Sequence, residues 1–169
     1  KNASHEFTTI DNVKEDVLEI ILNLKNLRMK IHSDDDEIIK LELKSTGENK
    51  VTAKEITKNS NVDIMNPELH IAEVTDKKGE LDMEISIAKG TGYTSIESRE
   101  ESIEKEVGYI DVDSIFSPVK LVKVEIENVR VGKMTNWEKL IIDIKTDGSI
   151  DFKEAFKQTA DILVNQFSF

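Results

Sequence analysis

The sequence has no cysteine, only two prolines and seven glycines, and aromatic side chains make up 5% of its 169 residues. The absence of cysteine excludes disulfides, thiolate metal sites and cysteine nucleophiles, and it fits a reducing compartment. The scarcity of proline and glycine argues against a disordered or low-complexity chain. No apolar run approaches the roughly 20 residues of a membrane-spanning helix, and no secretory signal opens the sequence. We therefore expect a folded protein with no membrane segment.

Positive charge is also scarce: the sequence has 23 Lys and Arg but 34 Asp and Glu, which gives a net charge of −11. A surface this acidic repels phosphate groups, so the chain is poorly suited to grip DNA or RNA itself. Hydrophobic residues make up 38% of the sequence, which is enough for a core at this length. A role in nucleic-acid metabolism would therefore have to run through partner proteins.

Apolar periodicity predicts most of the secondary structure. Helical spacing covers residues 13–27, with Asn12 and Glu15 as a start signal. Residues 76–79 (DKKG) predict a hairpin turn between two neighbouring strands. Residues 94–106 are so rich in charge that they predict a mobile surface loop. Alternating apolar residues predict strands at 29–32, 37–44, 69–75, 81–88, 109–112, 119–131 and 138–146.

The last third of the sequence predicts two long antiparallel strands followed by a helix. Asp151 is the predicted cap of this helix, with Glu154 at capping-box spacing. One face of the helix carries Phe152, Ala155, Phe156, Thr159, Ile162, Leu163 and Phe167. Two strands and one helix bury little surface, so this face needs another surface to cover it. The whole pattern predicts an α+β fold of mostly antiparallel sheets with two main helices, in modules of about 1–117 and 118–169.

No group of residues predicts catalysis or a bound cofactor. The three histidines, His5, His32 and His70, lie on different elements, which favours structural or exposed roles over a shared metal site. Residues 34–37 (DDDE) lack the ligand spacing and central glycine of a calcium loop, so a solvated turn is the better interpretation. Residues 90–92 (GTG) follow a strand but open no helix, which favours a glycine turn over a phosphate cradle.

Six segments, in chain order, nevertheless follow a known pattern. They are HEF with VKEDVLEIILNLKNL within 5–27, VTAKEI at 51–56, GTGY at 90–93, DVDSIFSPV at 111–119, VEIENVRVGKMTNWEKLIIDIKTDGSID at 124–151, and the helix FKEAFKQTADIL. Together these segments cover essentially the whole chain, and they resemble the alpha subunit of bacterial DNA-directed RNA polymerase.

The resemblance implies a scaffold within a nucleotidyltransferase complex. In this family the N-terminal domain forms a homodimer on which the beta and beta-prime subunits assemble, and the catalytic magnesium site lies in those large subunits. Residues 1–117 would be a β-rich insert subdomain, and residues 118–169 the C-terminal half of the dimerisation subdomain. The family's first strand and a long helix precede the position of His5 and are absent from this sequence, as is its C-terminal DNA-binding domain. We expect a cytoplasmic chain without catalytic residues, metal or cofactor, which contacts DNA only through that absent domain.

The resemblance also marks individual residues. Lys25 and Val112 match family positions that contact the beta-prime subunit; the alternatives are an ordinary lysine near a helix end and an inward-facing strand residue. Phe156, Leu163 and Phe167 are expected at the dimer interface, and the alternative is that they cover their own sheet. Two other functions stay open, namely a β-rich module that binds a small ligand or peptide, and an acidic metal-dependent hydrolase.

Overall fold

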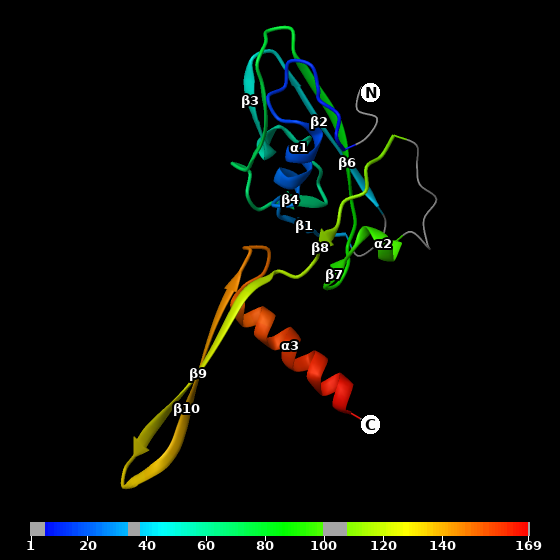
Figure 1. The fold of residues 1–169 in the computed structure, drawn as a ribbon. Coiled ribbons are helices and arrows are strands. Elements are labelled where there is room, and N and C mark those ends of the chain that lie inside the picture. The colour runs from blue at the N-terminus through cyan, green and yellow to red at the C-terminus, as the bar shows by residue number, and fades with distance from the viewer. Residues whose placement is uncertain (1–5, 34–37, 100–107, 169) are drawn as a thin grey trace. The chain divides into compact units, whose positions relative to one another are not determined.

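The computed structural model describes residues 6–33, 38–99 and 108–168, and the chain divides into two compact units, Lys1–Phe116 and Ser117–Phe169 (Figure 1). The fold is α+β, and every ladder formed by the described residues is antiparallel and two-stranded, as the sequence predicts. The elements of the first unit are α1 (Val17–Leu24), β1 (Met29–Ile31), β2 (Ile39–Thr46), β3 (Asn49–Thr52), the 3-10 turn η1 (Ala53–Glu55), β4 (Val62–Ile64), β5 (His70–Val74), β6 (Glu80–Ile87), β7 (Tyr93–Thr94), α2 (Ile96–Arg99) and β8 (Ser114–Ile115).

The first helix begins later than predicted. Asp16, not Asn12, is its N-cap: the Glu19 N–H donates to Asp16 Oδ1 at 2.7 Å. Asn12 has a left-handed backbone with φ of 62°, and its carbonyl accepts from Thr75 N at 2.8 Å. The Lys14 N–H likewise donates to Glu73 O at 2.9 Å. The segment before α1 therefore adds to the edge of β5 instead of winding into the helix.

The predicted hairpin at residues 76–79 is wrong. β5 pairs with β3, and β6 pairs with β2, so the two strands that flank this turn belong to different ladders. The chain also changes ladder between β2 and β3, and the Gly47 N–H donates to Gly79 O at 2.9 Å where the two turns meet. Gly47 has a φ of 81°, and a Cβ at Gly79 would lie 2.5 Å from Val74 Cγ1. Two glycines thus let both connections turn at the same place.

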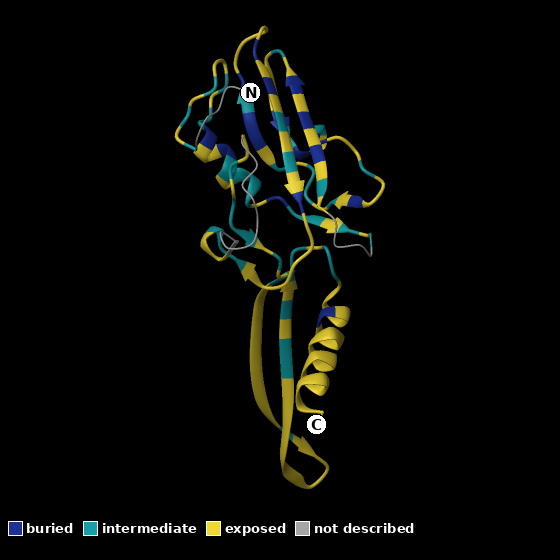
Figure 2. Ribbon diagram, turned by 90° about the vertical axis from the view of Figure 1, so that its right-hand side faces the viewer, coloured by how far each residue is buried: buried dark blue, intermediate teal, exposed yellow. Residues whose placement is uncertain are grey.

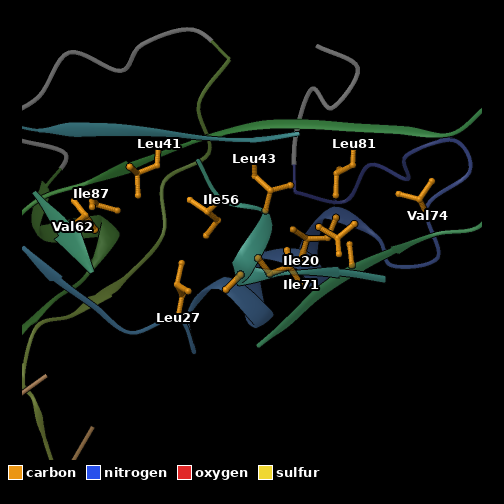
Figure 3. Packing of buried hydrophobic residues seen from close by; sticks show 13 residues of the cluster. Ile20, Leu27, Leu41, Leu43, Ile56, Val62, Ile71, Val74, Leu81 and Ile87 are labelled. Carbon is orange, nitrogen blue, oxygen red and sulfur yellow. The ribbon is translucent and has the colours of Figure 1, made fainter. Parts of the chain in front are cut away.

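Side chains from α1 and the ladders build the core of the first unit. β2 alternates strictly, with Leu41 and Leu43 buried and the charged residues between them exposed. Figure 3 shows Leu43 close to Ile20 of α1 and Ile71 of β5 within this cluster. Leu43, Ile71 and Val51 are fully buried. Burial of a side chain of this kind stabilises the fold by roughly 1.5–3 kcal/mol.

Two further predictions need correction near the end of the first unit. Residues 94–99, expected in a mobile loop, instead complete β7 and form α2, while 100–106 lie outside the described residues. The predicted strand at 109–112 does not form. Its place is taken by β8, whose two residues pair with β7 in the register Tyr93↔Ile115.

The second unit agrees with its prediction, except that its second long strand begins at Met134 and not at residue 138. β9 (Val119–Val131) and β10 (Met134–Thr146) form one long antiparallel ladder, and α3 (Phe152–Phe167) follows. Asp151 caps α3 by accepting from Lys153 N at 3.2 Å. Glu154 makes no capping box and instead accepts from Gln158 at 3.2 Å. None of the helices among the described residues combines the length and hydropathy needed to cross a membrane.

Candidate functional site

Two residues that lie far apart in the sequence meet at the end of α1. Lys25 is the C-cap of α1, and its ammonium nitrogen lies 3.1 Å from Asp113 Oδ2, 88 residues along the chain. Val112, the other residue predicted to contact a large subunit, directly precedes Asp113. The structure therefore brings both predicted contact residues to one place. Sequence reasoning missed Asp113, because nothing in its local pattern shows a partner so distant.

Asp113 is held at both of its carboxylate oxygens. Its Oδ1 accepts from the Ile96 N–H in the first turn of α2 at 3.0 Å, while Oδ2 faces Lys25. These contacts, first the backbone hydrogen bond and then the lysine, keep the pKa of Asp113 below its ordinary value. The Lys25 and Asp113 side chains are 33% and 28% exposed. At neutral pH this is a charged pair with open access to solvent.

Val112 is half-buried and lies outside any strand, so the alternative of an inward-facing strand residue is wrong. Its carbonyl accepts from Ser114 Oγ at 3.4 Å. Lys25 is not simply a solvated lysine either, because it forms an ion pair with Asp113. Whether these residues touch a partner stays a prediction.

The segment Gly90–Gly92 directly precedes β7 and contacts Phe116, which follows β8. The Phe116 N–H donates to Gly92 O at 2.8 Å, and the Phe116 ring lies against Gly90. A Cβ at Gly90 would fall 2.6 Å from the ring, well inside van der Waals contact. The glycine thus makes room for an aromatic ring. The sequence predicted the turn but gave no sign of the ring that fills it.

The second candidate surface is the apolar side of the second unit. Phe156 and Leu163 are each 53% exposed and Phe167 is 78% exposed. Figure 2 shows α3 and β9 mostly exposed and part of β10 half-buried, and of the described residues in this unit only Ala155 is buried. Ala155 of this stripe is buried, whereas Phe156, Leu163 and Phe167 are not buried against their own sheet. Exposed apolar residues that sequence reasoning did not single out also lie here: Leu121, Val122, Val124, Ile126, Val131, Met134, Trp137, Leu140 and Val164.

Histidine and acidic residues form no metal-binding group within the described ranges. His32 lies 2.6 Å from Asp63, and His70 lies 2.7 Å from Glu15, each as an isolated pair. His5 and the acidic turn at 34–37 fall outside the described residues.

A surface hollow beside α1 is lined in part by Glu15, the acidic member of one of these pairs. Burial by itself would raise the pKa of Glu15, but hydrogen bonds from His70 and from the Glu73 N–H outweigh it and keep that pKa below its ordinary value. The hollow is lined by Lys14, Glu15, Glu19, Leu22 and Asn23. Four of these five side chains are polar or charged, unlike the mostly apolar walls of ligand pockets. The hollow therefore does not favour the alternative of a ligand-binding module.

Comparison with known proteins places the chain in a family. The family described as "RNA polymerase Rpb3/RpoA insert domain" matches residues 1–117. The DNA-directed RNA polymerase subunit alpha of Desulforamulus reducens is 46% identical over 159 residues, which are 94% of this chain and 49% of the relative. That of Carboxydothermus hydrogenoformans is 46% identical over 160 residues, 95% of this chain and 50% of the relative. The chain spans about half the length of these curated relatives. The predicted resemblance is confirmed, and the chain belongs to the RNA polymerase Rpb3/RpoA insert domain family, together with alpha subunits of bacterial DNA-directed RNA polymerase.

Proposed function

We propose that this chain is an assembly scaffold of bacterial DNA-directed RNA polymerase and acts in transcription in the cytoplasm. It forms a homodimer on which the beta and beta-prime subunits assemble, and it supplies no catalytic residue itself. Residues 1–117 are the insert subdomain, and residues 118–169 belong to the dimerisation subdomain. Contact with DNA is left to a further domain of the subunit.

The observation that carries the proposal is the uncovered apolar surface of the second unit. Apolar patches of this kind, with aromatic residues among them, mark protein interfaces. Phe156, Leu163 and Phe167 project from one face of α3 and are all more than half exposed. Phenylalanine side chains bury about 150–250 Å² each in an interface, so covering this face would stabilise a complex by several kcal/mol, at about 25 cal/mol per Å². A second copy of the subunit is the proposed cover.

The dimer is tested with a charged replacement in this face. We expect Leu163→Asp, in the full-length product of the gene, to convert dimers into monomers, because the interface would then bury an unpaired carboxylate. Light scattering after gel filtration measures the mass. Asn165→Asp is the matched control, since it adds the same charge about 200° around the helix. If Leu163→Asp stays dimeric while its circular dichroism and melting are unchanged, the dimer assignment is wrong.

The contact with the large subunits is proposed for the end of α1. Lys25 and Val112 lie in adjoining segments there, joined through Asp113. A partner that touches one of these residues is in reach of the other. This placement supports a shared contact surface. We expect Lys25→Met to capture the beta-prime subunit more weakly than the wild type, and equal capture would mean that the contact lies elsewhere.

A further inference from the structure

We infer that Asp113 is a positioning residue of the large-subunit contact: its carboxylate fixes the Lys25 ammonium group so that the remaining N–H donors of that group meet an acceptor oxygen on the partner. The inference rests on the proposed function and deepens it. It assigns a role to Asp113, which neither the sequence pattern nor the family resemblance singled out.

Both ends of the ion pair are anchored in the fold. The Lys25 N–H donates to Ile21 O at 2.9 Å, so the residue is fixed as the last turn of α1 closes. Asp113 is fixed by the Ile96 N–H at 3.0 Å, which directs its second oxygen to Lys25 at 3.1 Å. The carboxylate can therefore not follow the lysine if that side chain moves away. Asp113 is bound by the Ile96 N–H of α2, and it holds the Lys25 side chain at the end of α1 in place.

Lys25 keeps unused hydrogen-bonding capacity. An ammonium group has three donors and no acceptor. In the described part of the chain, the structure shows a single acceptor for this nitrogen, Asp113 Oδ2. The side chain is one-third exposed, so the other donors are accessible to a partner. A carboxylate or a backbone carbonyl oxygen is the chemical group that would complete the site.

Positioning a lysine before it binds has a defined physical benefit. A free lysine loses much of its rotamer entropy when a partner immobilises it. Asp113 removes part of that freedom in the unbound chain, so less is lost on binding. The Asp113 carboxylate is ionised at neutral pH, as an ordinary aspartate is, and its lowered pKa extends the ion pair with Lys25 to more acidic pH. The expected consequence is tighter capture of the partner without any direct contact from Asp113.

The test uses the full-length product of the gene and measures capture of the purified beta-prime subunit by its complex with the beta subunit. Asp113→Asn retains an oxygen that accepts from Ile96 N but removes the negative charge opposite Lys25. We expect capture to weaken roughly three- to ten-fold, in the lower part of the range of coupled contact pairs, with an unchanged melting temperature. We expect Lys25→Met to weaken capture by a comparable factor. The double variant should capture the beta-prime subunit as well as Lys25→Met alone does. Asp111→Asn, on the same segment and exposed, is the matched control and leaves capture unchanged.

Each other outcome overturns the inference in a recognisable way. If Asp113→Asn captures as well as the wild type, Asp113 positions nothing and the proposed scaffold function still stands. If the losses of the two single variants add in the double variant, the residues act independently. If capture and melting temperature fall in parallel, the pair only stabilises the fold. If the wild-type protein captures no large subunit at all, the proposed function fails and this inference with it.

Discussion

Replacing Gly90 by alanine tests the account of the Gly90–Gly92 turn most sharply. In the structure, a Cβ at Gly90 would lie 2.6 Å from Phe116 Cε2 and 2.7 Å from Cδ2 and Cζ. Carbon atoms in good contact are about 3.5–4.0 Å apart, so the ring or the backbone must move by about 1 Å. The backbone N–H of Phe116 extends the β7–β8 ladder by donating to Gly92 O, so a movement of Phe116 weakens that ladder.

The magnitude follows from two opposing effects. Overpacking of this kind typically lowers the free energy of unfolding by about 1–3 kcal/mol. Because the Phe116 ring is only half-buried and can move, we expect about 1.5–2 kcal/mol here. Alanine also lowers the conformational entropy of the unfolded chain, which stabilises the fold by about 0.4–1 kcal/mol. This gain applies at Gly90 because its backbone is not left-handed. The net destabilisation is about 1 kcal/mol, which corresponds to a roughly five-fold larger opening constant for the ladder.

Hydrogen exchange of the Phe116 amide measures this opening directly, because that N–H bonds to Gly92 O at 2.8 Å. We expect exchange about five-fold faster in Gly90→Ala than in the wild type. The rescue control is Phe116→Leu, which removes the flat ring: adding Gly90→Ala to it should change exchange little. An unchanged rate in Gly90→Ala, or full additivity in the double variant, would refute the proposed ring contact.

Three further predictions concern the first unit. Leu43→Ala should lower the free energy of unfolding by about 3 kcal/mol in urea denaturation, because Leu43 is fully buried, whereas the same change at the 59% exposed Ile38 should cost under 1 kcal/mol. Asp16→Ala should remove the N-cap of α1 and cost about 1 kcal/mol, seen as faster amide exchange in that helix. Glu15 has a lowered pKa in the folded state, so its stabilising contribution is present above the unfolded pKa near 4 and is lost as pH falls through the folded pKa. In Glu15→Gln the free energy of unfolding should therefore decrease less steeply below about pH 5 than in the wild type. The same pH dependence in both proteins would contradict this.

Long periodic segments were predictable from the sequence because their own residues determine them. Residues 119–131 alternate over their whole length, and β9 has those bounds. Asp151 and the apolar spacing after it place α3 in the same way. The prediction that the α3 stripe needs a further cover also came from the sequence, since two strands offer too little surface.

Pairings between distant segments were not predictable. β1 pairs with β4, residues 62–64, a strand of three residues that is too short to show a period. The turn at 76–79 has the composition of a hairpin, but β5 pairs with β3 and β6 pairs with β2. The Lys25–Asp113 pair joins residues 88 positions apart through a contact that only the folded chain brings about. The local sequence shows which residues share one face of a strand or helix. Which segment packs against that face depends on tertiary contacts.

The central claim, that this chain is an assembly scaffold, is tested most directly by mixing the full-length product of the gene with the beta and beta-prime subunits of the same organism. Native mass spectrometry then measures the mass of the complex that forms. We expect a complex that holds two copies of the subunit together with both large subunits, and we expect Leu163→Asp to prevent its formation. A wild-type protein that stays monomeric and captures neither large subunit would contradict the account.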